Sequence, residues 1–244
     1  MKKDESACSQ SLRFRRQRTI LVLSALFLLI VSLCVAKWLG PERVPTASLQ
    51  TRPVLVIDPG HGGIDGGAIA RDGTKESDLN LSIALKLRDL SAFFGVETVL
   101  TRDDDLPRTD LISYSEHEDL VFRSEIANHI DRAILFSIHQ NTFPTSQPHG
   151  VQVLYGAGEE SRRLGELTHG KLIQSLQPDN RRVAAPAPSK LYLTSHVDCP
   201  VILIECGFLS NLSDLQLLCD SRYQTKFGAV LLSSYLHFTR TPNL

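Results

Sequence analysis

The stretch VLVIDPGHGGIDGGA, residues 54–68, joins a short apolar run to a glycine-rich segment that contains one histidine and two carboxylates. Four consecutive apolar residues that end at Asp58 are typical of a strand buried on both faces, as found in parallel sheets covered by helices. Pro59 and Gly60 favour a turn directly after this strand. We therefore expect His61 to lie in a loop at the end of a buried strand.

A glycine-rich loop after a strand is also typical of dinucleotide-binding folds, which use the pattern G-x-G-x-x-G. Gly60 and Gly62 match its first two glycines, but Asp65 stands where the third would be. The loop would also place Asp58 and Asp65 where phosphates bind. Glycines that let the backbone pass close to a metal ion fit this loop better, and a simple sharp turn with positive φ is the alternative.

Further short apolar runs alternate with stretches of helical period. In one of these stretches the apolar positions from Leu79 to Phe94 step by three or four residues, with Ser77 or Asp78 available as the N-cap. This alternation predicts an α/β fold, a mainly parallel twisted sheet with helices on both faces, in a single domain over residues 54–240. The expected strands are 54–58, 97–101, 133–138, 151–155 and 201–205, and the expected helices are 78–94, 119–130, 161–176 and 222–238.

The chain has 244 residues, of which 42% are hydrophobic, enough for one folded domain with a sizeable core. Residues 1–40 carry seven basic and two acidic side chains, which leaves 19 basic and 25 acidic side chains, a formal charge of −6, in residues 41–244. Phosphate contacts need clustered Lys and Arg, so we expect no nucleic-acid partner.

Residues 19–36 form an uncharged apolar stretch of 18 residues that is preceded by RFRRQR. As a helix this stretch spans roughly 27 Å, close to the thickness of a bilayer core. Basic residues on its N-terminal side predict a cytoplasmic segment 1–18 and an exported domain, joined to the anchor by a linker over 37–53. Because no A-x-A cleavage site follows, we expect an uncleaved, single-pass signal-anchor in the cell membrane.

Two further predicted strands also end in residues that can carry chemistry. Strand 133–138 is followed by His139-Gln140-Asn141, and strand 201–205 ends at Glu205. The carboxyl ends of parallel strands meet at one edge of a sheet, so His61, His139 and Glu205 would lie together there. Two histidines and a glutamate with an open fourth position are typical of catalytic zinc sites, and Glu76, just ahead of a predicted helix, is a second candidate for that glutamate.

Two other readings of the end of strand 201–205 remain open. A carboxylate that follows VILI must be paired, metal-bound or strongly shifted in pKa, so Glu205 could form a structural salt bridge. Cys206 with His139 as base could instead form a thiol hydrolase, but the neighbouring Glu205 would raise the pKa of that thiol. The exported part has three cysteines, Cys199, Cys206 and Cys219, and we expect a fold that does not depend on disulfides.

Seven motifs follow one another between residues 54 and 238: VIDPGHGGIDGGA, KESDLNLSIALKLRDL, VLTRDDD, FRSEIAN, LFSIHQNTFP, GVQVLY and VILIECGFLSN. Taken in order, they resemble the zinc-dependent N-acetylmuramoyl-L-alanine amidases of bacterial cell walls. The resemblance implies Zn²⁺ bound by His61, Glu76 and His139, with Glu205 as the catalytic residue. Asn141 and Arg123 are candidate substrate-binding residues, although Arg123 could equally be a surface residue of its helix.

The resemblance further implies hydrolysis of the amide between the lactyl group of N-acetylmuramic acid and L-alanine of peptidoglycan. A compact domain behind one membrane segment is most similar to the sporulation amidases of endospore formers, which act in spore cortex maturation and muramic δ-lactam formation. An accessory protein for folding or metal loading is compatible with this reading. The alternatives are a zinc peptidase or deacetylase acting on wall polymers, and a non-catalytic wall-binding protein of the same fold.

Overall fold

The computed structural model describes residues 52–105 and 114–240, together with six positions between residues 24 and 32. The predicted segment 1–18 lies outside the described residues, and so do 12 of the 18 residues of the predicted anchor 19–36 and residues 37–51 of the predicted linker 37–53. No helix in the described parts of the chain is long and apolar enough to cross a membrane. Residues 52–244 form one compact unit, which contains all the buried apolar side chains of the core.

Six strands form a single sheet in the order β2-β1-β3-β6-β4-β5. Strands β2, β1, β3 and β6 are parallel to one another, which confirms the mainly parallel sheet, whereas β4 runs antiparallel to β6. The strands are β1 (Val54–Pro59), β2 (Thr98–Leu100), β3 (Ala133–Asn141), β4 (Gln152–Tyr155), β5 (Ala185–Pro186) and β6 (Val201–Phe208).

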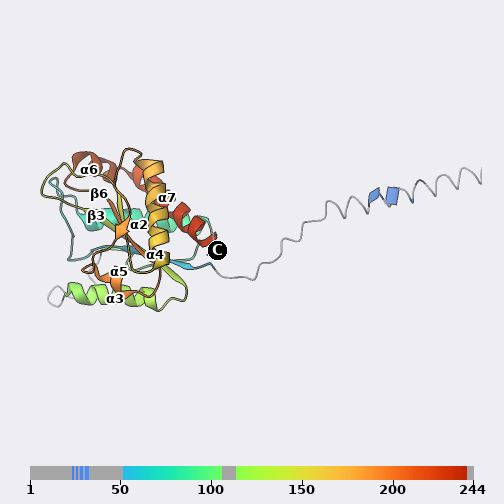
Figure 1. The fold of residues 1–244 in the computed structure, drawn as a ribbon, viewed down its shortest axis with the longest axis horizontal. Coiled ribbons are helices and arrows are strands. Elements are labelled where there is room, and N and C mark those ends of the chain that lie inside the picture. Colours follow the sequence, from blue (N-terminus) through green and yellow to red (C-terminus); the bar gives the residue numbers. More distant parts are fainter. Residues whose placement is uncertain are drawn as a thin grey trace, which may run out of the picture. The chain divides into compact units, whose positions relative to one another are not determined.

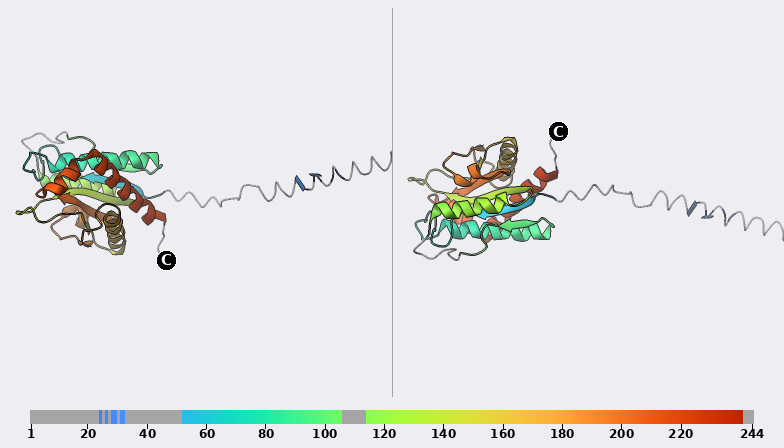
Figure 2. Two further views of the ribbon diagram at one scale, coloured as in Figure 1. Left: turned by 90° about the horizontal axis from the view of Figure 1, so that it is seen from above. Right: turned by 90° about the horizontal axis from the view of Figure 1, so that it is seen from below.

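Helices cover both faces of this sheet (Figures 1 and 2). Leu55 and Ile57 of β1 pack into the larger core with α2, α4, α6 and α7, whereas Val56 packs with α3 on the opposite face. The strand is therefore apolar on both faces, as its sequence predicts. The helices are α2 (Glu76–Phe93), α3 (Glu116–Asn128), α4 (Glu159–Leu176), α5 (Tyr192–His196), α6 (Leu212–Cys219) and α7 (Ser221–Arg240).

Helix α2 begins two residues earlier than its apolar period predicts, at Glu76 rather than at residue 78. Its N-cap is Lys75, whose side chain makes no capping hydrogen bond. The N–H groups of the first turn, which have no partner within the helix, bond to loop carbonyls instead: the Glu76 N–H donates to the Ala68 carbonyl and the Ser77 N–H donates to the Gly66 carbonyl. Glu76 therefore belongs to the helix and is fixed against the glycine-rich loop.

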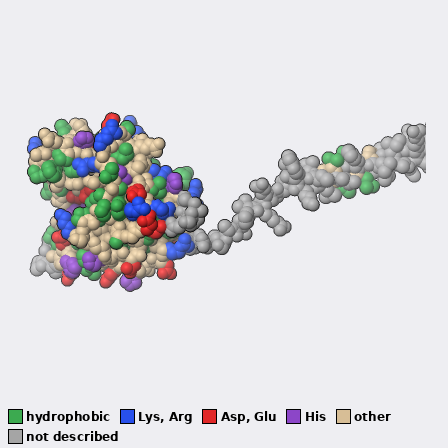
Figure 3. Space-filling view, in the orientation of Figure 1, with side chains coloured by type: hydrophobic (Ala, Val, Ile, Leu, Met, Phe, Trp, Pro, Cys, Tyr) green, Lys and Arg blue, Asp and Glu red, His purple; other side chains and the backbone are tan. Residues whose placement is uncertain are grey.

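Strands β1, β3 and β6 lie next to one another, and their carboxyl ends meet at one edge of the sheet. Asp58 of β1 pairs with Ser137 of β3, and His139 of β3 pairs with Glu205 of β6. This arrangement confirms that the predicted strand ends open on a common edge. On the face shown in Figure 3, basic and acidic side chains lie interspersed.

Candidate metal centre

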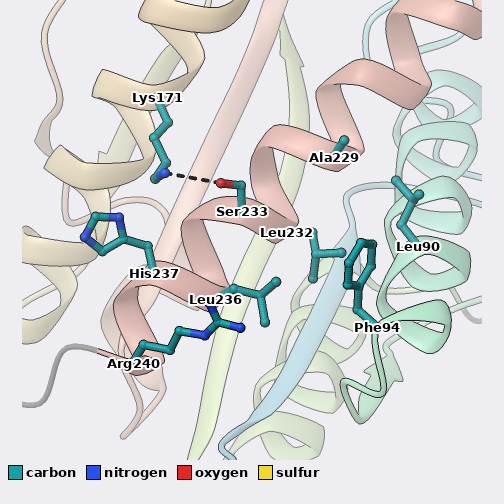
Figure 4. A pocket seen from close by; sticks show the side chains of 9 residues that line it. All are labelled: Leu90, Phe94, Lys171, Ala229, Leu232, Ser233, Leu236, His237 and Arg240. Atoms are coloured by element: carbon teal, nitrogen blue, oxygen red, sulfur yellow. Dashed lines mark hydrogen bonds between the residues drawn. The ribbon is translucent and has the colours of Figure 1, made fainter.

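Two hollows differ in the chemistry of the residues that line them. The larger, of about 550 Å³, lies among α2, α4 and α7 and contains no carboxylate side chain (Figure 4). Its walls are mostly apolar, with Lys171 donating a hydrogen bond to Ser233. The smaller, of about 260 Å³, lies at the carboxyl edge of the sheet and is lined by His61, Glu76, His139 and Glu205, among others. Only the smaller hollow holds the residues of a hydrolytic site.

His61 occupies the turn after β1 with φ of 59°, in the left-handed region that non-glycine residues rarely adopt. Its Nδ1 lies 2.6 Å from Asp65 Oδ2, and its Nε2 lies 3.4 Å from Glu76 Oε1. The Asp65 carboxylate accepts the Nδ1 proton, which leaves Nε2 as a ligand atom directed toward Glu76. Asp65 therefore sets the orientation and tautomer of this histidine.

Glycines make room for this arrangement at two points. A Cβ atom on Gly60 would lie 2.2 Å from the His139 ring, and one on Gly67 would lie 2.7 Å from the His61 ring. Gly67 also has φ of 65°, which glycine adopts without strain. These glycines allow the loop backbone to approach the rings of the two histidines, and the positive φ of Gly67 also agrees with the alternative of a sharp turn.

Glu76 is 4% exposed, and both of its carboxylate oxygens are held by backbone N–H groups. Gln140 N–H donates to Oε1 and Ala68 N–H donates to Oε2, each at 3.0 Å. Burial raises the pKa of Glu76, but hydrogen bonds from His139 and His61 outweigh it and hold the pKa well below its usual range. Glu76 is therefore an ionised carboxylate in the site.

His139 completes a group that can hold a metal ion. Its Nδ1 lies 3.1 Å from Glu76 Oε1, and its ring centroid lies 5.0 Å from that of His61. One ligand atom from each of His61, Glu76 and His139 lies within 4.8 Å of the others, and no other such group occurs in residues 52–105 and 114–240. Two imidazoles and one carboxylate form the donor set of a catalytic zinc site, so these residues fit that ion.

The charge of the site also favours a cation. Burial lowers the pKa of His61, but hydrogen bonds and charge interactions with Glu76 and Asp65 outweigh it and raise the pKa to about 9. The imidazole thus lies in a strongly anionic environment. A divalent cation bound among these groups would compensate the same carboxylates and keep the imidazole neutral.

Glu205 lies on β6, opposite His139 in the neighbouring strand. Its Oε2 atom is buried and has no hydrogen-bond partner among the described residues. Burial raises the pKa of this carboxyl, although the charge of His139 partly opposes the shift. No salt bridge to Glu205 occurs within the described residues, so its carboxylate is available to a group inside the cavity.

The two candidate substrate-binding residues have different positions. Arg123 is 4% exposed, so the alternative that it is a surface residue of its helix is wrong. It lines the cavity, but its guanidinium donates to Asp58, Asp119 and two backbone carbonyls. Asn141 is not among the cavity-lining residues, and its Oδ1 accepts a hydrogen bond from Thr142 N–H.

Several residues of the site carry no strong signal in the sequence. Gln140 and Asn80 bond to each other beside Glu76, and Asn80 also donates to the Gly60 carbonyl. Asn80 could have been found as the residue one turn after Glu76 on the buried face of α2. The cavity wall from Lys190 to Thr194 comes from a loop and the short helix α5, where no periodic pattern indicates a site.

The cysteines do not form a competing site. Cys199, Cys206 and Cys219 are free thiols, in agreement with a fold that does not depend on disulfides. Cys206 is fully buried, and burial together with the Glu205 charge raises the pKa of its thiol well above the usual value. A protonated, buried thiol is a poor nucleophile, which disfavours the thiol hydrolase.

A model of the N-acetylmuramoyl-L-alanine amidase family matches residues 55–234, which include the whole cavity edge. The chain belongs to this family. The germination-specific N-acetylmuramoyl-L-alanine amidase of Bacillus subtilis is 34% identical over 192 residues, which cover 76% of this chain and 79% of that one. The amidase LytC of the same organism is 31% identical over 76% of this chain and 35% of its own length.

Solved structures show the same fold for this amidase. The CwlD amidase from Clostridioides difficile, determined in complex with the GerS lipoprotein, has a TM-score of 0.70 and 34% identity, over 76% of this chain and 98% of that one. The amidase AmiC2 of Nostoc punctiforme has a TM-score of 0.67 and 27% identity, over 78% of this chain and 98% of that one. The resemblance found in the sequence is confirmed, and the chain is an enzyme of this class.

Proposed function

We propose that this amidase uses zinc to hydrolyse the amide between the lactyl group of N-acetylmuramic acid and L-alanine of the peptidoglycan stem peptide. The observation that carries the proposal is the convergence of His61, Glu76 and His139 beside the unpartnered carboxylate of Glu205 in one cavity. Membership of the family supports the choice of scissile bond.

His61, Glu76 and His139 would hold the ion. When bound, zinc polarises a carbonyl group and lowers the pKa of water to near neutrality. Asp65 fixes the His61 ring through its Nδ1 proton, and the N–H groups of Ala68 and Gln140 fix the Glu76 carboxylate. These contacts keep the three ligands in place before substrate arrives.

Glu205 would act as the general base and then as the general acid. Its carboxylate, which lines the cavity beside His139, would accept a proton from the attacking water and deliver it to the nitrogen of the leaving L-alanine. Burial raises the pKa of the Glu205 carboxyl, which strengthens it as a base and brings its proton affinity closer to neutral pH.

The polymer would bind along the part of the cavity lined by Tyr114, α3 and the segment from Lys190 to Thr194. Helices α3 and α5 are in contact there, with the ring centroids of His117 and Tyr192 5.4 Å apart. Arg123 and Lys190 both line the cavity, and the Arg123 guanidinium is bonded to protein acceptors. Lys190 makes no hydrogen bond or ion pair within the described residues, so its ammonium group is available to a ligand. It lies where a carboxylate of the stem peptide can be recognised.

The same metal set would also suit a zinc peptidase or a deacetylase, whereas a non-catalytic wall-binding protein would not need it. The family match favours the amidase over both zinc alternatives. A binding protein of this fold would have no use for an unpartnered buried glutamate beside three metal ligands, because such a group costs stability.

We further propose an extracytoplasmic setting in the sporulating cell. The sequence of residues 19–36 supports a single-pass anchor in the cell membrane, with the catalytic domain in the wall or in the space between the forespore membranes. The germination-specific relative supports a role in cortex maturation and muramic δ-lactam formation. The solved CwlD complex with a lipoprotein supports an accessory partner for folding or metal loading.

Mass spectrometry of digested peptidoglycan tests the activity. Purified sacculi treated with zinc-loaded enzyme should release stem peptides with a free L-alanine amino terminus, and enzyme treated with a chelator should release none. Cleavage within the stem peptide, or deacetylated sugars, would replace the amidase by one of the zinc alternatives. Full activity of metal-free protein would contradict the proposed zinc.

A deletion strain tests the setting. Cells without the protein should grow and divide normally but form spores whose cortex lacks muramic δ-lactam and which germinate poorly. Chained vegetative cells with a normal cortex would contradict the sporulation role and leave the amidase chemistry intact.

A further inference from the structure

Two buried arginines lie directly behind the loop that carries His61. Arg102 follows β2, Arg123 lies on α3, and each side chain is 4% exposed. Neither is a ligand, and the chemistry proposed for the site assigns no proton transfer to them. Buried guanidinium groups require a full set of acceptors, and both of these groups donate to backbone carbonyls of the loop that carries His61.

Arg102 joins the His61 turn to the first turn of α2. Its Nε donates to the Pro59 carbonyl at 2.9 Å, and its Nη2 donates to the carbonyls of Gly60 at 3.1 Å and Ser77 at 2.9 Å. Ser77 directly follows Glu76, so one side chain connects the backbones that carry two of the ligands. A Cβ atom on Gly62 would lie 2.6 Å from Arg102 Nε, so the close approach requires glycine.

Arg123 holds the same turn from the opposite side of the sheet. Its Nη1 donates to the Pro59 carbonyl at 2.9 Å and to Asp58 Oδ1 at 2.8 Å, and its Nη2 donates to the His61 carbonyl at 2.8 Å. The two arginines together therefore bond three successive carbonyls, those of Pro59, Gly60 and His61.

This clamp acts on a residue with a strained backbone. His61 has φ of 59°, a conformation that costs free energy for any residue other than glycine and persists where its surroundings hold it. Without the guanidinium donors, the three carbonyls would be buried without these partners, and the turn could relax toward ordinary φ values. Relaxation would move the His61 ring away from Glu76 and His139.

We propose that Arg102 and Arg123 are positioning residues that preorganise His61 and Glu76 for the metal ion, so that metal affinity depends on both guanidinium groups. This inference rests on the proposed zinc site. Arginine rather than lysine is needed because a planar fork can donate to several carbonyls at once, whereas an ammonium cannot reproduce that geometry.

Zinc affinity of the full-length chain, measured by competition with a chromophoric chelator, tests the proposal in Arg102→Lys and Arg123→Lys. Each variant should bind zinc about 10–100-fold more weakly, the usual effect of removing a group that orients a metal ligand. The matched control is Arg163→Lys on α4, whose guanidinium pairs with Glu160 away from the site and whose loss should leave zinc affinity unchanged. The visible spectrum of the Co²⁺-loaded protein should change in the first two variants and not in the control.

Asp105→Asn provides a milder variant should the lysine variants fail to fold. Asp105 Oδ1 lies 3.8 Å from Arg102 Nη1 and accepts the Gly63 N–H at 2.9 Å, and the residue is partly exposed. This variant should fold and bind zinc more weakly than the parent. Parent-like zinc affinity and Co²⁺ spectra in the folded variants would overturn the clamp alone, whereas a parent chain that binds no zinc would overturn the proposed metal as well.

Discussion

The carboxyl ends of β1 and β6 each bury a carboxylate beside the same cavity, and the two carboxylates have opposite surroundings. Asp58 of β1 accepts hydrogen bonds from Thr101, Ser137 and Arg123 at 2.6, 2.7 and 2.8 Å. Burial alone would raise its pKa, but these partners outweigh burial and lower the pKa to about 2. Glu205 of β6 has a buried oxygen without a partner in the described chain, and burial raises its pKa.

The difference separates a structural carboxylate from one available for chemistry. Asp58 connects β1 to Thr101 after β2, to Ser137 of β3 and to Arg123 of α3. Its carboxylate is therefore fully engaged by groups of the fold. Glu205 lines the cavity and keeps one buried oxygen without a hydrogen-bond partner in the described chain, an arrangement that costs stability and is typical of functional sites. Substitution of Asp58 should therefore change mainly the stability of the fold, and substitution of Glu205 should change mainly the turnover.

The largest effect is expected when a metal ligand beside these two carboxylates is removed. His61→Ala and His139→Ala should each lose stoichiometric zinc and reduce amide hydrolysis to background, because a catalytic site with three protein ligands loses one of them. Metal analysis of the purified variants gives the result directly. Stoichiometric zinc in either variant would show that a different set of residues binds the ion.

Asp58→Asn should destabilise the fold strongly. Removing the charge takes one of its two carboxylate partners from the buried Arg123 guanidinium, which keeps Asp119, and should lower the free energy of unfolding by about 2 kcal/mol, the value that corresponds to the lowered pKa of Asp58. Urea denaturation of the parent and the variant measures the difference. A variant as stable as the parent would mean that the β1 carboxylate does not hold the fold.

The pH dependence of stability sharpens the comparison. The pKa of Asp58 is lowered from 3.8 to about 2 on folding, so the unfolded chain takes up this proton first as the pH falls. The stabilisation, about 2 kcal/mol, is complete above the unfolded pKa and is lost as the pH falls through the folded value. Between pH 5 and pH 2, Asp58→Asn should therefore lose about 2 kcal/mol less stability than the parent in urea titrations. Equal losses in both proteins would contradict the assignment.

The smallest effect is expected for a carboxylate that is charged but exposed. Glu159 pairs with Arg162 on the surface of α4, away from the cavity. Glu159→Gln should leave the free energy of unfolding, the zinc content and the turnover close to those of the parent, since exposed ion pairs contribute little. A loss comparable to that of Asp58→Asn would show that burial does not distinguish the two pairs.

The sequence was most informative where strands are apolar on both faces. The runs at 54–58, 133–138 and 201–205 correspond to β1, β3 and β6, which form the centre of the sheet. The antiparallel direction of β4 could not be predicted, because side-chain periodicity is the same for both directions. The start of α2 at Glu76 was also missed, since loop carbonyls rather than a capping side chain satisfy its first turn.

The sequence predicted that the residues with explicit chemistry would lie together, and it gave no signal for those that we propose to act through the backbone. His61, Glu76 and His139 are brought together as expected. The proposed arginine clamp depends on guanidinium groups that reach carbonyls 25 to 64 residues away in sequence, which no local pattern reveals. Asn141 does not line the cavity, and its Oδ1 accepts the Thr142 N–H instead, a local contact that the sequence pattern does not reveal.

The central claim is that Glu205 is the catalytic base and Glu76 a metal ligand. Zinc content and turnover measured on the same preparations of Glu205→Gln and Glu76→Gln test it most directly. Glu205→Gln should retain stoichiometric zinc and lose about 10²–10⁴-fold in turnover, the usual effect of removing a general base, whereas Glu76→Gln should bind zinc more weakly. Zinc lost from Glu205→Gln and retained by Glu76→Gln would contradict the account and exchange the two roles.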